Sequence, residues 1–528
     1  MLTKLVLGAQ LHLSVVTRSA VTIVERMLLV PELTGLSHIN ENTEWQTSTL
    51  SLSLRQATVP YVALNFLSAF LRIWPCIMSE LLTLHIGGFG TRVGYDYWKQ
   101  IAADHCVTEN GTFDPAPVQD YDGGVDAVKD RITTMFDECP DGRYKPRSIF
   151  IDLEPGAFDS APHSMFDPSC FFAGKAGTDG IWAIGHCTNR TPGYPHEAFL
   201  RGQRAAKQRI EVWLEPIRKS IERCDRFHGF QHFSSFGGGT GSGLGTLLAR
   251  ELQEEYRTST YDAHLLFPSL DAGDTPTSIY NTSLSVRFFT EYATNCMLYQ
   301  NKAVASHALC GGQRSYDDIN TIIAAAAATA TSSYRLAAQP TLDSRRLHHS
   351  MTPFPRLHYY IPCLSRVALP NDPAQAVRDV LPGEDGLPPV ATRLCGTKAS
   401  TACHVAATVI CRSNTISTSS LERECRVLRH QVLPNGKIFN AATPLTSVNT
   451  YPRANGATTA LSLLNTSAIA SPLKDVCKSF TKMFQRRVHL HYYTQHGVEE
   501  YEIKRSLDNM TWLVEDYQRI GLGTHELY

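Results

Sequence analysis

The segment of this 528-residue chain with the most distinctive chemistry is glycine-rich: residues 237–243 read GGGTGSG. Backbone N–H groups of such a loop, followed by a helical pattern, suit a phosphate, because the first N–H groups of a helix lack partners and its dipole favours negative charge. Ordering five glycines is entropically costly. The segment therefore favours a ligand-binding loop over a merely flexible turn.

Three familiar motifs fail on spacing. A GxGxxG fingerprint lacks its third glycine, and a GxxxxGK[ST] phosphate loop fails because Leu244 follows Gly243. A GxSxG nucleophile elbow around Ser242 fails because Thr240 and Leu244 occupy its glycine positions. The loop thus predicts phosphate binding of another kind.

Apolar strand candidates alternate with helical patterns after residue 78. The expected strands are 81–86, 148–153, 229–233 and 263–267, and the expected helices lie near 95–103, 196–227 and 244–256. This alternation indicates an α/β fold with a mostly parallel sheet covered on both faces. Ligands bind at the carboxyl ends of such strands. Both glycine groups, 87–90 and 237–243, fall there.

Composition excludes several classes of protein. The chain is 43% hydrophobic and 19% charged, and 49 Lys and Arg against 50 Asp and Glu leave a net charge of −1. It can bury a large core, and the balanced charge predicts no nucleic-acid partner. Fourteen cysteines without a CxxC pair indicate reduced thiols rather than a disulfide scaffold.

The first 77 residues do not share the strand–helix pattern. Residues 1–24 contain basic but no acidic residues, which weakly resembles a transit peptide. The apolar stretch 57–78 is broken by prolines, an asparagine and an arginine, whereas a spanning helix needs about 20 apolar residues. We interpret 1–77 as an extension, or as a consequence of a start codon assigned upstream of Met78, and expect no membrane partner.

Six strings resemble the tubulin family, in the same order along the chain. They are Met78 with Leu84-His-Ile-Gly87, Ile151-Asp-Leu-Glu-Pro155, Trp182-Ala-Ile-Gly-His186, Ser235-Phe-Gly-Gly-Gly-Thr-Gly-Ser-Gly243, Pro353-Phe-Pro-Arg-Leu-His358 and Met483-Phe-Gln-Arg-Arg487. The resemblance spans about residues 78–520 and is weak between 365 and 462. It implies a GTP-binding domain at 78–300, a core helix and intermediate α/β domain at 301–465, and C-terminal helices at 466–528.

The resemblance implies a guanine-nucleotide site. Asn301, Tyr316 and Asn320 match the positions that hold guanine. Amide side chains suit the polar edge of the base, and a tyrosine ring can stack on its face. Taken alone, Tyr316 is better explained as a residue that opens a helix and packs in the core.

The implied phosphate half combines backbone, hydroxyl and carboxylate groups. Its matching positions are Gly87, Gly88, Phe89, Ser235, Gly237, Gly238, Gly239, Thr240, Gly241 and Asp274, and Asp152 and Glu154 match acids near Mg2+ and the attacking water. The expected cofactors are therefore GTP and Mg2+.

Several positions depart from the family pattern. Gly88 stands where glutamine is usual, Phe89 where Cys or Ala is usual, Gly180-Ile181 where an Asn-Asn pair is usual, and Ser278 where glutamate is usual. In addition, the neighbouring Asp179 repels phosphate unless a cation compensates. These departures predict weakened nucleotide binding.

The residue that triggers hydrolysis in a neighbouring tubulin subunit is also altered. Asp343 is retained, but Arg346 occupies the position at which alpha-type chains carry a glutamate and beta-type chains a cation. A guanidinium stays protonated and cannot act as a general base. We expect no catalytic residue in this chain and GTPase activity only when a partner subunit completes the site. The competing interpretation of Arg346 is a solvated charge beside Arg345.

The leading functional prediction is a GTP-binding cytoskeletal protein of microtubule-type assemblies in the cytoplasm, specialised for the centriole or basal body. Arg346 and residues 354–358 resemble beta-type tubulins, and 489–500 also resemble the delta, epsilon and zeta group. Residues 521–528 hold one acid, unlike an extended acidic tail. The implied partners are alpha-type or other tubulin subunits and microtubule-associated proteins.

Two alternatives remain open at this stage. One is a non-polymerising tubulin-like scaffold with a weakened nucleotide site. The other is an unrelated nucleotide enzyme with a catalytic base near Asp152 or Glu154. The spacing of His489 and His491 suits a strand face, and we expect a structural role for both rather than a metal site.

Overall fold

The computed structural model describes residues 79–522 apart from several gaps. The gaps are 119–123, 160, 163, 188–202, 271–274, 308–314, 337, 340, 366–372, 383–386, 398–401, 414, 427–444 and 450–457. The chain divides into Met1–Met78 and Ser79–Tyr528, and only the second unit is described. The proposed extension, 1–77, lies outside the described residues, and the boundaries at 300 and 465 stay predictions.

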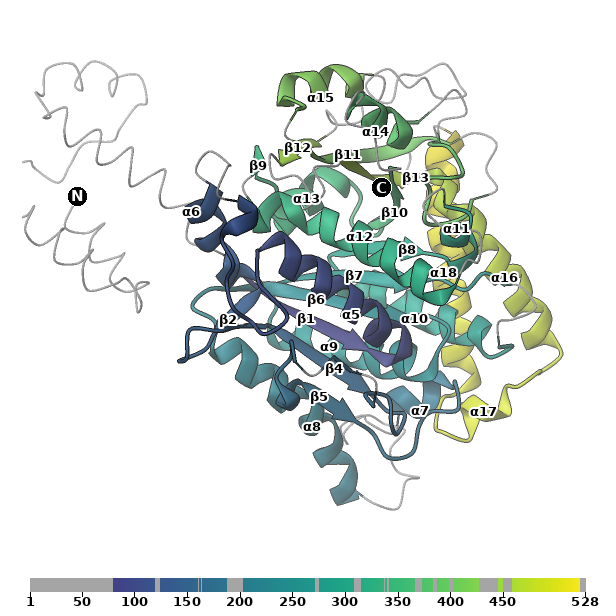
Figure 1. Ribbon diagram of the computed structural model, residues 1–528. Coiled ribbons are helices and arrows are strands. Elements are labelled where there is room, and N and C mark those ends of the chain that lie inside the picture. Colours follow the sequence, from purple (N-terminus) through teal and green to yellow (C-terminus); the bar gives the residue numbers. More distant parts are fainter. Residues whose placement is uncertain are drawn as a thin grey trace, which may run out of the picture. The chain divides into compact units, whose positions relative to one another are not determined.

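One mixed sheet runs through the described chain (Figure 1). Its strand order is β5-β4-β1-β6-β7-β8-β10-β13-β11-β12-β9. The strands are β1 Glu80–Ile86, β4 Ser148–Asp152, β5 Phe171–Ala173, β6 Phe227–Ser235, β7 Thr260–Leu266, β8 Asn295–Tyr299, β9 Ala338–Gln339, β10 Tyr359–Leu364, β11 His404–Arg412, β12 Leu445–Asn449 and β13 Thr459–Thr466; β2 Phe136–Glu138 and β3 Tyr144–Pro146 form a separate antiparallel pair. The predicted α/β class is confirmed.

Strand direction divides the sheet into two parts. Neighbouring strands are parallel from β5 through β10, whereas β13 is antiparallel to both β10 and β11. Inside the parallel part, β8 pairs with β10 only at Tyr359–Cys296 and Tyr360–Met297. Every residue of β1 is buried, including the polar Thr83 and His85, as expected for parallel strands covered on both faces.

Helices cover both faces of the parallel part (Figure 1). On one face α5 (Gly87–Asp104) packs against α12 (Tyr316–Arg335); on the other, α9 (Gly245–Glu255) packs against α10 (Ser278–Tyr292), which in turn contacts α16 (Ala470–Gln485) and α18 (Glu500–Leu522). The remaining α-helices are α6 Gly124–Lys129, α7 Trp182–Cys187, α8 Gln203–Glu222, α11 Asn301–Ala305, α13 Ser344–Met351, α14 Pro373–Val380, α15 Thr418–Glu424 and α17 His491–Thr494. Helix α12 lies within the range 301–465 in which the resemblance predicts a core helix.

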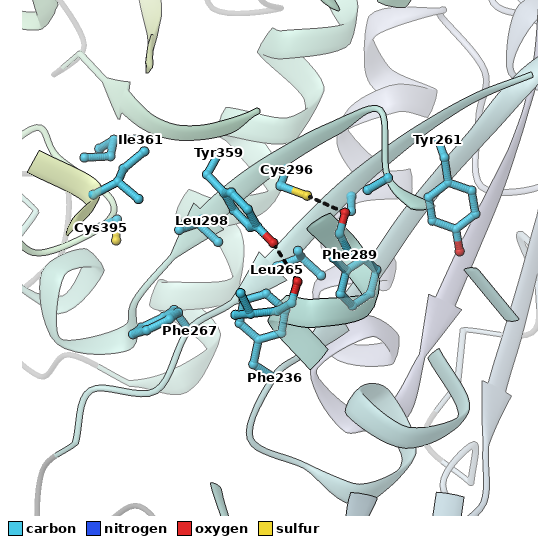
Figure 2. Packing of buried hydrophobic residues seen from close by; sticks show 14 of the residues in the cluster. Phe236, Tyr261, Leu265, Phe267, Phe289, Cys296, Leu298, Tyr359, Ile361 and Cys395 are labelled. Carbon is cyan, nitrogen blue, oxygen red and sulfur yellow. Dashed lines mark hydrogen bonds between the residues drawn. The ribbon is translucent and has the colours of Figure 1, made fainter. Parts of the chain in front are cut away.

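Two large apolar cores lie on the two faces. Because strand residues alternate between faces, Leu81 joins the core under α5 and α12, while Leu82 and Leu84 join the core under α9, α10 and α18. Figure 2 shows part of the second core, where Leu265, Leu298 and Tyr359 from β7, β8 and β10 lie near Phe289 of α10. Side chains from both parts of the sheet therefore share one core.

Two local predictions from the sequence are wrong. Residues 87–90 are not a loop, because α5 begins directly at Gly87. His489 and His491 are not on a strand: His489 has a φ of +58°, and His491 begins α17. A period-two pattern in a four-residue helix flanked by turns is too short to distinguish strand from helix.

The described cysteines are all free thiols, in agreement with the expected reduced state. No described helix is long and apolar enough to cross a membrane.

A buried polar network joins β7, β8 and β10 to α13. Asp262 Oδ1 accepts hydrogen bonds from Asn295 Nδ2 at 2.6 Å and Ser344 Oγ at 2.7 Å, and Tyr360 Oη donates to Asn295 Oδ1 at 2.8 Å. Burial raises the pKa of Asp262 to about 6, although both hydrogen bonds oppose the shift. The carboxylate is thus destabilised relative to the neutral acid.

Replacing Asp262 by asparagine should change how stability depends on pH. Because the folded pKa is raised, this carboxyl stabilises the fold below about pH 4 and loses that contribution as pH rises through about 6. Two pK units correspond to about 2–3 kcal/mol. Asp262→Asn retains the Oδ1 acceptor, so the stability difference from the parent chain should move in favour of the variant over this range. Urea unfolding at a series of pH values measures it; a pH-independent difference would contradict the prediction.

Candidate nucleotide site

The strand order places the residues singled out from the sequence at the carboxyl ends of β1 and β6, and we call this position the crevice. The first six parallel strands follow the order β5-β4-β1-β6-β7-β8, in which the chain leaves β1 in one direction and β6 in the other. This is the topological switch point where open α/β sheets bind ligands. Gly87 follows β1 and the glycine-rich segment follows β6, so both flank the crevice, as predicted.

Close packing explains why both segments contain glycine. Gly87 has a φ of +73°, and a Cβ there would lie 2.9 Å from Gly241 N. A Cβ on Gly239 would lie 2.4 Å from Thr178 Oγ1, and one on Gly243 would lie 2.4 Å from Trp182 O. None of the glycines between 237 and 243 has positive φ. The loop is therefore fixed largely by contact with its neighbours.

The loop continues directly into a helix. Ser235 ends β6, residues Thr240–Leu244 form one turn of π-helix, and α9 follows at Gly245. Thr240, Gly241 and Gly239 are buried, whereas Ser235, Gly237 and Gly238 are half-buried. A π-turn is common at functional sites, and this helix start faces the crevice in the way that binds anions in other folds.

Asn281, which the sequence analysis missed, holds the loop in place. Its side chain is fully buried in α10 and donates to Gly180 O and Gly237 O, both at 2.8 Å. Its Oδ1 accepts from Trp182 N at 3.0 Å and Tyr493 Oη at 2.6 Å. One amide thus connects two loops of the crevice to α17. The feature of the sequence that could have identified Asn281 is a polar residue within the apolar face of a helix.

Two carboxylates stand beside the loop. Asp152 ends β4 and is 3% exposed; burial raises its pKa, while hydrogen bonds from the Glu154 backbone and the Thr240 side chain oppose the shift. Glu154 is exposed overall, and its Oε1 accepts from Thr178 N at 3.0 Å. The predicted acids are therefore brought together with Thr240. Among the described residues no cluster of three metal-ligating side chains is found.

The residues predicted to hold the base lie at the same edge of the sheet. Asn301 follows β8 as the first residue of α11, and Tyr316 and Asn320 lie in the first two turns of α12, which contacts α11. The Tyr316 side chain is 67% exposed, whereas Asn320 is 8% exposed. The helix-opening interpretation of Tyr316 is confirmed, but its packing into the core is wrong. Its exposed ring leaves a face for stacking.

The positions at which this chain departs from the family pattern differ in the space and the polar atoms that they offer a ligand. A Cβ on Gly88 would meet nothing within 4 Å, so its side is open. Ser278 Oγ is buried and has no hydrogen-bond partner among the described residues, and Ser278 Cβ faces Gly237. Asp179 and Gly180 both have positive φ, and Phe89 is half-buried. An orphaned hydroxyl beside the loop is consistent with a missing polar ligand. Asp274 lies outside the described residues.

Arg346 lies away from this crevice, on α13. It is exposed, its backbone N–H donates to Asp343 Oδ1 at 2.7 Å, and its Nη1 donates to Thr341 O at 3.0 Å. Asp343 is thus the N-cap of α13. Within a single chain, Arg346 is a surface cation.

Replacing Gly239 by alanine should damage the site. The added methyl would collide with Thr178 Oγ1 and with Ile181 N at 2.7 Å, so the loop must move by several tenths of an ångström or more. We expect nucleotide affinity to fall at least tenfold, because displaced N–H groups lose aligned charge-assisted hydrogen bonds. Isothermal titration measures affinity, and thermal unfolding measures stability.

Gly88→Ala is the control for the stability measurement, because its methyl enters open space. Unchanged nucleotide affinity in Gly239→Ala would show that the loop tolerates displacement and would contradict the assignment.

The fold is that of an α/β protein whose glycine-rich loop follows β6 at the switch point of a parallel sheet, a place where nucleotide-binding proteins hold their ligands. Residues 80–308 match the family model described as the Tubulin/FtsZ family, GTPase domain. The chain is 30% identical over 467 residues to the tubulin beta-5 chain of Ectocarpus variabilis, covering 85% of this chain and 96% of that one. It is 29% identical over 459 residues to the tubulin beta-6 chain of Gossypium hirsutum, with the same coverage. The chain belongs to the tubulin family and is a divergent, tubulin-like cytoskeletal protein.

Proposed function

We propose that this chain binds GTP in the β1–β6 crevice and joins microtubule-type assemblies through other tubulin subunits. The observation that carries the proposal is the order of these groups along the sheet. The glycine loop follows β6, Asp152 at the end of β4 accepts a hydrogen bond from the Thr240 side chain, and Tyr316 begins α12, which contacts α11 after β8. Family membership supports the guanine nucleotide.

Different residues would bind the phosphates, the base and the Mg2+ ion. The glycine loop and the helix start behind Thr240 would hold the phosphates. Asn301 and Asn320 would hydrogen-bond the base edge, and Tyr316 would stack on it. Asp152 and Glu154 would supply oxygen ligands to Mg2+, which usually takes one or two protein carboxylates together with phosphates and waters. Asp274 belongs to the same proposed set through sequence alone.

The direct test is the nucleotide content of the purified full chain, followed by titration of GTP and GDP with and without Mg2+. About one guanine nucleotide per chain, or saturable binding, supports the proposal. Tyr316→Ala should weaken binding by roughly tenfold, since stacking of a base is worth about 1–3 kcal/mol. An absence of affinity for guanine nucleotides would leave the scaffold interpretation. Magnesium-independent affinity would remove Asp152 and Glu154 from the set.

A gain of function at Gly88 provides a sharper test. The open space at this position accommodates a glutamine, and one hydrogen bond to a charged phosphate contributes about 1.5–3 kcal/mol before the entropy of the side chain is subtracted. We expect Gly88→Gln to raise GTP affinity several-fold, with Gly88→Ala as the matched control. Equal affinities for the two variants would show that the glycine does not weaken the site.

Hydrolysis and assembly form the second part of the proposal. We infer that Arg346 does not trigger hydrolysis in a subunit whose nucleotide it touches, and that this chain hydrolyses its own GTP only when a partner supplies an acid. Specialisation for a centriole or basal body remains part of this proposal. The proposed location is the microtubule cytoskeleton of the cytoplasm, and the proposed partners are alpha-type subunits and microtubule-associated proteins. Co-pelleting with polymerised tubulin separates it from the alternative, a non-polymerising scaffold. Turnover by the isolated chain would instead favour a self-sufficient nucleotide enzyme.

A further inference from the structure

Tyr493 lies outside the nucleotide crevice, yet its hydroxyl is bonded to the side chain that joins the loops of the crevice. It belongs to α17, and its side chain is fully buried. Its Oη lies 2.6 Å from Asn281 Oδ1 and 3.0 Å from Thr277 O. Both of these oxygens can only accept, so the single hydroxyl proton is committed to them. The shorter bond therefore acts on the Asn281 amide, 212 residues earlier in the chain.

The four partners of the Asn281 amide fix the direction in which it points. Its Nδ2 donates to Gly180 O and Gly237 O. Its Oδ1 accepts from Trp182 N and Tyr493 Oη. These bonds use both protons and both lone pairs of the amide. In the flipped orientation the amide oxygen would face two carbonyls, and the amide nitrogen would face an N–H donor. The two donors thus hold the protons of the amide toward the crevice.

The two carbonyls that Asn281 binds belong to different loops. Gly237 lies in the glycine-rich loop after β6, and Gly180 lies just before α7. Gly180 O also accepts from Thr277 Oγ1 at 3.3 Å. Because one side chain bonds to both loops, a shift of its amide changes the distance between them. The backbone N–H groups proposed to hold the phosphates would move with the glycine-rich loop.

Packing against the C-terminal helices determines the position of the Tyr493 ring. It packs edge-to-face on Tyr280 with ring centroids 5.3 Å apart, in an apolar cluster that joins α7 and α10 to α16, α17 and α18. The preceding backbone is strained, because Arg487 and His489 have φ values of +53° and +58°. Such strain persists only where the surrounding structure over-determines the chain. The hydroxyl is therefore held at a fixed point beside the Asn281 amide.

We infer that Tyr493 is a positioning residue for the nucleotide loop: its hydroxyl orients the Asn281 amide, which sets the spacing between Gly180 and Gly237. The inference rests on the proposed function, since the loop is taken to bind the phosphates of a nucleotide. A loop that is ordered before the ligand arrives avoids the entropy cost of ordering on binding. Loss of the hydroxyl should therefore weaken binding even when the aromatic ring and its apolar contacts remain.

The test is Tyr493→Phe in the full chain, measured in two ways. Titration with GTP and Mg2+ should show an affinity about fivefold lower than that of the parent chain, equivalent to about one net hydrogen bond. Hydrogen exchange of backbone amides, followed by mass spectrometry in the nucleotide-free chain, should be several-fold faster over residues 237–243, because the loop opens more often. The second measurement does not depend on a nucleotide.

Tyr280→Phe is the matched control. Tyr280 is fully buried in the same cluster, and its Oη donates to Val488 O at 3.0 Å. This variant also loses one hydroxyl and its hydrogen bond, but that bond does not reach the crevice. Its unfolding midpoint in urea should fall about as much as that of Tyr493→Phe. Its nucleotide affinity and the exchange over 237–243 should stay at the parent values.

The outcomes separate this inference from the proposed function. If the parent chain has no affinity for guanine nucleotides, the proposed function fails, and the exchange rates over 237–243 still decide whether Tyr493 orders the loop. Parent-like exchange and affinity in Tyr493→Phe would overturn the inference while leaving nucleotide binding intact. Equal changes in Tyr493→Phe and Tyr280→Phe would also overturn it, because they would reflect general loosening of the cluster.

Discussion

Replacing Asp104 by alanine is expected to be among the most destabilising single changes in this chain. Asp104 lies at the end of α5, and its side chain is 7% exposed. It pairs with Arg335 at the end of α12 and accepts from both Nη1 and Nη2 of Arg412 in β11, at 3.0 and 2.8 Å. Arg335 and Arg412 are at most 1% exposed.

The loss of stability arises because the substitution leaves two buried arginines without their carboxylate partner. Removing one partner of a buried ion pair costs about 3–5 kcal/mol, because the remaining charge is desolvated and uncompensated, and here two guanidinium groups lose the same carboxylate. That is a large share of a typical total stability of about 5–15 kcal/mol. Asp104→Ala should therefore lower the urea midpoint strongly or prevent accumulation of folded protein.

Asp141→Ala is the matched control. Asp141 also pairs with an arginine, Arg143, but both side chains are about half exposed, and such surface pairs contribute little. Its midpoint should match that of the parent chain. If Asp104→Ala unfolds at the same urea concentration as Asp141→Ala, the buried trio is not a stabilising element.

Mild acid should unfold this protein over a narrow range of pH. Four histidines, His85, His105, His232 and His264, are fully buried, and burial lowers the pKa of each to about 3. Two of these rings have close partners in the folded chain: His85 accepts from Trp98 Nε1 at 3.0 Å, and His264 stacks on Phe233 with centroids 4.4 Å apart.

The direction in which stability changes with pH follows from comparing the histidine pKa values of the folded and unfolded chains. Because the folded pKa values are lowered, these histidines contribute stability above about pH 6.5, and that contribution is lost as pH falls toward 3. Once the histidines of the unfolded chain are protonated, each buried histidine lowers the free energy of unfolding by about 1.4 kcal/mol per pH unit. Four of them together lower it by about 5 kcal/mol per pH unit. Asp262 opposes the trend, since its pKa is raised to about 6. We expect cooperative unfolding between about pH 6 and 5.

Circular dichroism during a pH titration checks this expectation. The variant His264→Gln should reduce the slope of unfolding free energy against pH by about one proton, while His349→Gln, at an exposed position, should leave the slope unchanged. Full retention of the fold at pH 4, or equal slopes in the two variants, would contradict the argument.

Features set by local sequence patterns, such as the positions of the strands and the glycine-rich loop, could be predicted from the sequence. Apolar runs identified β1, β4, β6 and β7 to within about two residues at most ends, because parallel strands buried on both faces are rich in apolar residues. The glycine-rich segment follows the carboxyl end of β6, as expected, and its role in binding stays a prediction. However, its glycines serve close contacts with Thr178 and Trp182, which are distant in sequence and invisible in a local pattern.

Long-range polar pairing was not predictable from the sequence. Asp104 meets Arg335 and Arg412 across 231 and 308 residues, and no spacing rule connects them. Asn281 looked like an ordinary helical residue until Gly180, Gly237 and Tyr493 were seen to converge on it. Charged and amide side chains acquire such roles only once the topology is known.

The border between β8 and β10 has a mechanical consequence. Only two residue pairs join these strands, yet the same border is spanned by the Tyr360–Asn295 hydrogen bond and by the apolar core that Leu298 shares with Tyr359. Within the described residues, hydrogen-bonded neighbours continue without a break from β5 to β9. Strain applied to one part of the sheet must therefore twist or shear a continuous hydrogen-bonded surface, as in sliding of packed elements rather than rotation about a hinge. Inside the sheet, bending should be greatest at the two-pair ladder between β8 and β10.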